Sequence, residues 1–103
     1  MRLFGHPTVK PSDALTPHRA EVLRILAEAG ARNPRVFGSV ARGDDTEESD
    51  LDLLIDAPPG FTLLDLAGLQ LDLAALLGVP VDLGTGFRTQ AIADGVALDA
   101  KPL

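Results

Sequence analysis

Short strand patterns alternate with helical patterns along this chain, and the alternation limits the folds that it can adopt. Residues 50–56 alternate polar and apolar side chains, as expected of a strand with one solvated face. A Pro-Pro-Gly sequence at 58–60 ends this strand, and residues 62–77 then form a leucine-rich helical pattern that Gly78 stops. Another strand is expected at residues 79–83. The pattern predicts a layered arrangement of strands and helices.

The first helix is placed by its expected end signals. Residues 1–15, which contain prolines, are predicted as an unassigned N-terminal arm. Thr16 fits an N-cap, Pro17 fits the first helical position, and Gly30 can end the helix in a left-handed conformation. The apolar positions of this helix fall on one face: Val22, Ile25, Leu26 and Ala29.

The remaining elements are shorter. We expect a strand at residues 35–37, a short helix at 39–42 and a turn at 84–86. A last helix is expected at about 88–94, followed by an apolar tail at 96–98. The fold class predicted is α/β or α+β, with a small mixed sheet of three or four strands and helices mainly on one face. Residues 16–103 would form this single domain.

Composition excludes several classes of protein. The formal net charge of the 103-residue chain is −6, which argues against nonspecific nucleic-acid binding and against an anionic membrane surface. A basic protein partner remains compatible with this charge. The chain has no cysteine, so disulfides and cysteine-ligated zinc are excluded. No apolar run approaches the roughly 20 residues of a membrane helix, and we expect a cytoplasmic protein.

Gly38 and Ser39 follow the strand expected at 35–37. Glycine lacks a Cβ, so the backbone there can turn sharply and approach a ligand closely. The first N–H groups of the following helix, with the Ser39 hydroxyl, would suit a phosphate group. An ordinary strand-to-helix turn is the alternative interpretation.

Asp50 and Asp52 lie two residues apart on a predicted strand, so both side chains point to one face. With Cα atoms about 6.7 Å apart, their carboxylates can lean onto metal ions about 3.5–4 Å apart. Mg²⁺ prefers oxygen ligands and uses one or two carboxylates plus substrate phosphates. Asp82 would join them if its strand is a neighbour, as a metal ligand or as a base for an attacking hydroxyl. A solvated strand face is the alternative in each case.

Taken together, these features resemble a known motif. The sequence GSVARG at residues 38–43 is followed after six residues by DLDL at 50–53. This resembles the motif of the nucleotidyltransferase superfamily that includes DNA polymerase beta. It is most similar to the minimal nucleotidyltransferases, short prokaryotic members often paired with a HEPN-domain protein. The resemblance extends over about residues 15–98.

The resemblance implies roles for individual residues. Gly38 and Ser39 would contact the triphosphate of the substrate, ATP. Asp50 and Asp52 would hold Mg²⁺, with two ions expected. Asp82 would complete the metal site and favour deprotonation of the acceptor hydroxyl. The implied reaction is attack of a hydroxyl on the α-phosphate of a nucleoside triphosphate, with release of pyrophosphate.

Other charged residues have less specific interpretations. Arg42 could contact phosphate or pair with the acidic loop that follows it. The charged residues of that loop are interpreted as solvated: Asp44, Asp45, Glu47 and Glu48. Asp56 is expected to be a cap or a surface residue. Asp65 and Asp72 share one face of the leucine-rich helix, which would face either solvent or a partner protein.

Two functions fit this sequence. The first is an enzyme that transfers AMP from ATP to a tyrosine of a HEPN toxin and thereby acts as its antitoxin. The chain has no tyrosine, so it cannot modify a tyrosine of its own. The second is a non-catalytic module that neutralises a partner by covering it. Transfer to a small molecule, as in aminoglycoside-modifying relatives, ranks below both because those chains are longer.

Overall fold

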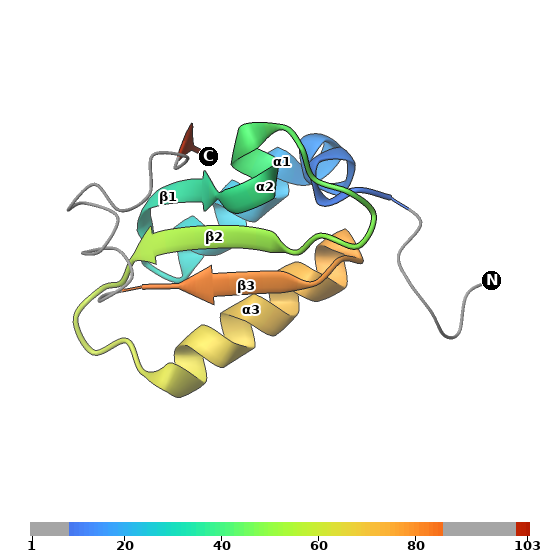
Figure 1. Ribbon diagram of the computed structural model, residues 1–103. Coiled ribbons are helices and arrows are strands. Elements are labelled where there is room, and N and C mark those ends of the chain that lie inside the picture. Colours follow the sequence, from blue (N-terminus) through green and yellow to red (C-terminus); the bar gives the residue numbers. More distant parts are fainter. Residues whose placement is uncertain (1–8, 86–100) are drawn as a thin grey trace.

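A single four-stranded sheet organises the chain. The computed structural model describes residues 9–85 and 101–103. Its elements are α1 (Pro11–Glu28), β1 (Arg32–Phe37), α2 (Gly38–Arg42), β2 (Leu51–Asp56), α3 (Leu63–Leu77), β3 (Val81–Gly84) and β4 (Lys101–Pro102). The strand order is β3-β2-β1-β4 (Figure 1). Strand β2 is parallel to β3 and antiparallel to β1, which is antiparallel to β4. The predicted mixed sheet is confirmed.

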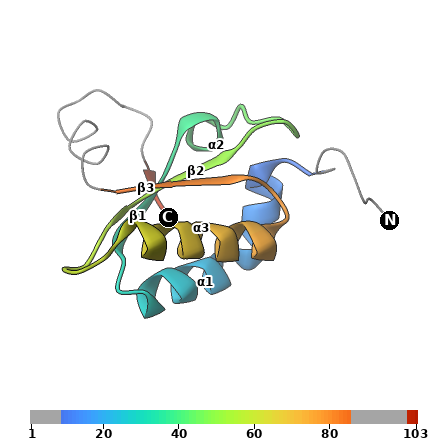
Figure 2. The ribbon, with the colours of Figure 1, turned by 90° about the horizontal axis from the view of Figure 1, so that it is seen from below.

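The two long helices cover one face of the sheet. Figure 2 shows α1 and α3 beneath the strands and the short α2 on the opposite side. The core between the sheet and the helices consists of aliphatic side chains, which include Val22, Leu26, Leu51, Leu53, Ile55, Leu73, Leu77 and Leu83. Strands β2 and β3 are parallel neighbours, so the chain must cross over between them, and helix α3 forms this connection. The expected placement of helices mainly on one face is therefore confirmed.

Helix α1 begins earlier than predicted. Its first residue is Pro11, whereas Thr16 and Pro17 lie inside the helix. The Asp45 carboxylate accepts a hydrogen bond from the Ser12 backbone N–H at 2.9 Å, which satisfies one of the first N–H groups of α1. Asp45 is buried, with an exposed fraction of 7%. The predictions of a start at Thr16 and of a solvated Asp45 were both wrong, because the acceptor comes from a distant loop.

Helix α3 forms as predicted. Thr62 is its N-cap, and Thr62 and Asp65 exchange side-chain hydrogen bonds in a capping box. Gly78 ends the helix with a φ of +72°. Among the leucines of this helix, Leu69, Leu73 and Leu77 are buried in the core, and Leu66 and Leu76 pack against it partly buried. Asp65 is thus a helix cap as well as a surface residue.

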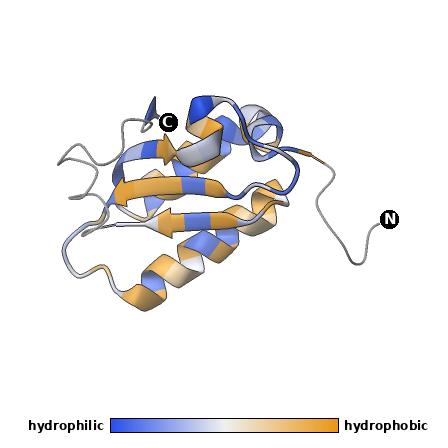
Figure 3. Cartoon of the chain, in the orientation of Figure 1, coloured by the Kyte–Doolittle hydropathy of each residue, from blue (hydrophilic) through white to orange (hydrophobic). Residues whose placement is uncertain are grey.

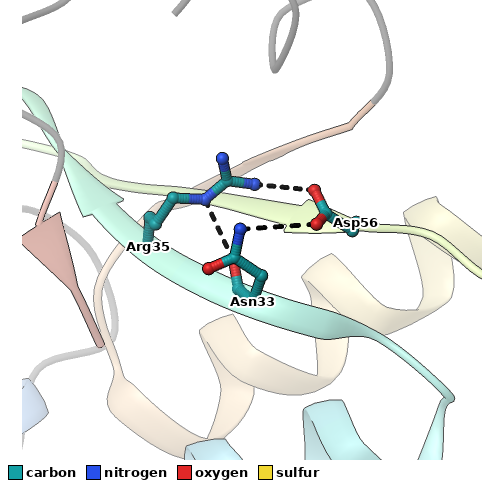
Figure 4. A network of polar contacts seen from close by, with 3 residues as sticks. All are labelled: Asn33, Arg35 and Asp56. Carbon is teal, nitrogen blue, oxygen red and sulfur yellow. Dashed lines mark hydrogen bonds and ion pairs between the residues drawn. The ribbon is translucent and has the colours of Figure 1, made fainter. Parts of the chain in front are cut away.

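A polar network fixes one end of β1 against β2. Strand β1 begins at Arg32, earlier than predicted, and its pairing with β2 is irregular between Arg32 and Arg35. Asn33 has a φ of +51° within this irregularity. Arg35 Nη2 lies 2.9 Å from Asp56 Oδ1, and the Asn33 amide lies 3.4 Å from Asp56 Oδ2 (Figure 4). Asp56 is exposed, as expected, and it also fixes the register of the two strands.

The last elements differ from the expected ones. Strand β3 begins at Val81 rather than residue 79, and Gly84 belongs to the strand rather than to a turn. Strand β4 was not predicted, and it pairs antiparallel with β1. The helix expected at 88–94 and the tail at 96–98 lie outside the described residues. In the part of the chain that is described, no helix has the length and apolar character needed to cross a membrane.

Candidate active site

Asp52 and Asp82 lie side by side on neighbouring strands. They are register partners in the parallel pairing of β2 with β3. Their chain neighbours Leu51, Leu53 and Leu83 are buried in the core, so both aspartates point to the sheet face opposite α1 and α3. Both aspartates are half-buried. Since neighbouring strands are about 4.8 Å apart, the sheet holds two carboxylates close together on a partly shielded surface.

The backbone of Gly38 closes one side of this surface. Phe37, the last residue of β1, pairs with Asp52, so Gly38 follows directly beside it. Gly38 has a φ of +74°, and a Cβ built on it would lie 2.6 Å from Asp52 Oδ2. No other residue type fits here without displacing the carboxylate or the backbone. The side chain of Asp52 thus lies close to the Gly38 backbone, and the approach of a ligand to Gly38 stays a prediction.

Ser39 lies in the first turn of α2, directly after Gly38. Helix α2 is only five residues long and ends at Gly43, which has a φ of +81°. The Ser39 carbonyl accepts a hydrogen bond from the Asp44 N–H at 3.0 Å, which holds the end of this turn. The Ser39 hydroxyl makes no hydrogen bond within the described residues, so it is available to a ligand.

Arg42 lies at the other end of α2. Its Nε is 3.3 Å from Asp44 Oδ2, and both side chains are exposed. Of the two interpretations of Arg42, the ion pair with the acidic loop is the one that this structure contains. A contact between Arg42 and phosphate stays a prediction.

Asp50 is not part of the strand. It is exposed and lies just before β2, whose first residue, Leu51, donates its N–H to the Pro80 carbonyl at 2.9 Å. Within residues 9–85 and 101–103, no group of three His, Cys, Asp or Glu side chains is placed to hold a metal ion. The structure therefore brings Asp52 and Asp82 together but does not assemble them with Asp50 into a three-carboxylate group.

Gln70 supports the strand that carries Asp82, and sequence reasoning missed it. Its Oε1 accepts a hydrogen bond from the Leu83 N–H at 2.9 Å. Strand β3 is at the edge of the four described strands, none of which lies on its outer side to accept this N–H. A polar residue among the leucines on the inner side of α3 was the signal in the sequence. Gln70 fixes β3 one residue away from Asp82.

Comparison with known proteins identifies the family. Residues 20–98 match the nucleotidyltransferase domain. The chain belongs to this family. It is 37% identical over 67 residues to a candidate protein adenylyltransferase of Methanocaldococcus jannaschii, and the matched region covers 65% of this chain and 72% of that relative. It is 42% identical over 69 residues to the protein adenylyltransferase MntA of Thermococcus cleftensis, and the matched region covers 67% of each chain.

Solved structures share the nucleotidyltransferase fold. A candidate minimal nucleotidyltransferase superposes with a TM-score of 0.73 at 44% identity, over 89% of this chain and 95% of the other. A toxin-antitoxin crystallised with AMP-PNP superposes with a TM-score of 0.67 at 19% identity, over 81% and 69% of the two chains. The second likeness concerns the fold alone. Sequence and fold together make this chain a nucleotidyltransferase enzyme.

Proposed function

We propose that this nucleotidyltransferase moves AMP from ATP to a hydroxyl group of a partner protein and acts as the antitoxin of that partner. The observation that carries the proposal is the register pair Asp52 and Asp82, held against the backbone of Gly38. Two relatives above 35% identity are described as protein adenylyltransferases, one of them as a candidate. The fold is also that of a toxin-antitoxin protein crystallised with AMP-PNP, an ATP analogue.

The two registered carboxylates fit a magnesium site completed by substrate. Mg²⁺ is commonly bound by one or two carboxylates together with phosphate oxygens, so a third protein carboxylate is not required. Asp52 and Asp82 would supply the protein ligands, and Asp50 stands close enough in sequence to add one when nucleotide binds. Bound Mg²⁺ would stabilise negative charge on the attacking and leaving oxygens.

The residues of this chain would position the reacting groups. The Ser39 hydroxyl would donate a hydrogen bond to the triphosphate, next to the turn at Gly38. Asp82 would accept the proton of the acceptor hydroxyl. The acceptor oxygen forms a bond to the α-phosphorus while the bond from that phosphorus to the pyrophosphate oxygen breaks. The half-buried setting of Asp52 and Asp82 would strengthen the electrostatic effects on this step.

The acceptor that we propose is a tyrosine of a HEPN-domain toxin. This chain contains no tyrosine, so the acceptor hydroxyl of a tyrosine must come from another protein. A protein substrate that docks on the surface of this domain would bring such a hydroxyl to the site.

Mass spectrometry of the acceptor tests this proposal. We would co-express the chain with its candidate HEPN partner and measure the intact mass of that partner. The wild type should add one or more AMP groups, and Asp52→Asn should lower the extent by roughly a hundredfold. Asp56→Asn is the matched control, because it makes the same change four positions along β2, outside the site. An unmodified partner with the wild type would contradict the proposal.

A non-catalytic module is the second candidate. One observation favours it: α3 exposes large apolar side chains that could cover a partner. The double variant Asp50→Asn, Asp52→Asn separates the two functions in a growth assay with the toxin. An enzyme would lose its neutralising activity, whereas a protein that merely covers its partner would keep it.

A further inference from the structure

The outer face of α3 is apolar although it faces solvent. Leu63, Leu64 and Leu71 have exposed fractions of 85%, 82% and 68%. Leu64, Gly68 and Leu71 follow one another at helical spacing, and Ala67 and Ala75 lie beside them, also exposed. Figure 3 shows α3 as mostly hydrophobic along its length. Apolar residues on every side are typical of a helix that is covered on both faces.

The few polar residues of α3 do not explain this face. Asp65 is engaged in the capping box at the start of the helix, and Gln70 binds the Leu83 N–H. Asp72 makes no hydrogen bond or ion pair with any described residue. It stands beside the apolar face as an unneutralised charge.

Gly68 gives an independent indication that something approaches this face. A Cβ built on Gly68 would have no atom within 4 Å, so packing inside the chain does not require glycine there. Glycine is unfavourable in a helix interior compared with alanine. A glycine between two exposed leucines allows the backbone of another helix to come close.

A groove continues from this face toward α1. It has a volume of about 510 Å³ and is lined by residues that include Ala29, Phe61, Leu64, Leu69, Asp65 and Asp72. Phe61, Leu64 and Leu69 give the groove apolar surface, and the carboxylates of Asp65 and Asp72 line it as well. This combination suits a long basic side chain, whose stem packs on apolar atoms while its charged end meets a carboxylate.

We propose that the α3 outer face, defined by Leu63, Leu64, Gly68 and Leu71, docks an apolar helix of the acceptor protein that carries lysine or arginine opposite Asp65 and Asp72. Taking the docked protein to be the acceptor rests on the proposed function. Helix α3 lies alongside β3, the edge strand that carries Asp82 (Figure 1). A partner docked on the outer face of α3 must therefore extend past the β3 edge to bring its acceptor hydroxyl to the opposite sheet face, where Asp52 and Asp82 lie.

Charge favours a basic partner over a second copy of this chain. Each copy has a net charge of −6, so two copies repel. In an antiparallel pair of α3 helices related by a twofold axis, the Asp65 and Asp72 side chains of both copies would share one side. Four carboxylates would then meet with no cation between them, whereas a helix with lysines would neutralise them.

The test uses a designed helical peptide as the probe. The peptide has leucines on one face and lysines beside them, and a second peptide has glutamates in place of the lysines. Fluorescence anisotropy measures the binding of each to the full chain. We expect the lysine peptide to bind and the glutamate peptide to bind at least about tenfold more weakly.

Variants of the face complete the test. Leu64→Glu, Leu71→Glu and Gly68→Gln should each weaken binding of the lysine peptide at least about tenfold. Leu23→Glu on α1 is the matched control, because Leu23 is an exposed leucine outside the face. This variant should bind the lysine peptide as tightly as the wild type does. The proposal would be overturned if the wild type did not bind the lysine peptide, or if the face variants bound it as tightly as the wild type. It would also be overturned if sedimentation showed a wild-type dimer that Leu71→Glu dissociates.

An ATP titration keeps this inference separate from the proposed function. The face variants should bind ATP and Mg²⁺ as the wild type does, since α3 lies on the sheet face opposite to Asp52 and Asp82. Peptide binding that survives in a chain without nucleotide binding would support the docking surface and count against the enzyme. Loss of ATP binding in Leu64→Glu or Leu71→Glu would show that the charge damages the fold, and Gly68→Gln, which adds a side chain where no atom lies within 4 Å, would then decide alone.

Discussion

The Asp52 carboxylate lies directly against the backbone of Gly38, where a Cβ would be only 2.6 Å from Asp52 Oδ2. The contact follows from strand pairing, because Phe37 is the register partner of Asp52 and Gly38 comes next. Gly38 thus has two reasons to be glycine: a φ of +74° and the absence of space for a side chain. The turn at Gly38, which is expected to contact the triphosphate, is therefore in contact with Asp52, one of the expected metal ligands.

Gly38→Ala should therefore abolish Mg²⁺-dependent ATP binding. The added methyl group would displace the Asp52 carboxylate, and the positive φ would cost about 1–2 kcal/mol of stability. Gly43→Ala is the matched control, because Gly43 has a φ of +81° but no atom within 4 Å of its Cβ position. Urea unfolding should show a similar loss for both variants, and calorimetric titration with ATP should show a loss only for Gly38→Ala. Equal ATP binding by the two variants would mean that the Gly38 contact has no functional role.

Gln70→Met should destabilise the edge strand that carries Asp82. Methionine has a similar shape but cannot accept the Leu83 N–H bond well, and loss of a partly buried bond costs about 1–2 kcal/mol. Faster hydrogen exchange at the Leu83 amide and a lower urea midpoint would show this. Gln70→Glu keeps an acceptor oxygen and serves as the control. If Gln70→Met left the exchange rate at Leu83 unchanged, the side chain would not be holding β3.

Asp45→Ala should lower the free energy of unfolding by about 1–2 kcal/mol, because the Ser12 N–H loses its acceptor at the start of α1. Asp44→Ala is the neighbouring control. The Asp44 side chain is exposed and, within residues 9–85 and 101–103, pairs with the exposed Arg42, so its loss should cost less than about 1 kcal/mol. Thermal unfolding of the two variants compares them directly. A larger loss for Asp44→Ala would contradict the role assigned to Asp45.

Local patterns were sufficient for the elements that are defined by their own sequence. Helix α3 has its apolar face and its terminal Gly78 within one segment, and both were predicted, whereas the capping role of Thr62 was not. Strand β2 was predicted from its alternation, although it starts at Leu51 rather than Asp50. The sequence motif also identified Gly38 and Asp52, which the structure brings into contact.

Long-range contacts account for the errors. The start of α1 depends on Asp45, 33 residues from Ser12, so the local signals at Thr16 and Pro17 were misleading. Strand β4 is two residues long and gains its order from pairing with β1, which no periodicity reveals. That Asp82 is the register partner of Asp52 also depends on strand order, which the sequence left open.

The most direct test of the candidate site is calorimetric titration of the chain with ATP in the presence and absence of Mg²⁺. The wild type should bind ATP only with Mg²⁺, and the double variant Asp52→Asn, Asp82→Asn should bind at least about tenfold more weakly. Asp56→Asn, on the same strand but outside the site, should bind as the wild type does. If the double variant bound ATP and Mg²⁺ as tightly as the wild type, the pair Asp52 and Asp82 would not be the nucleotide site.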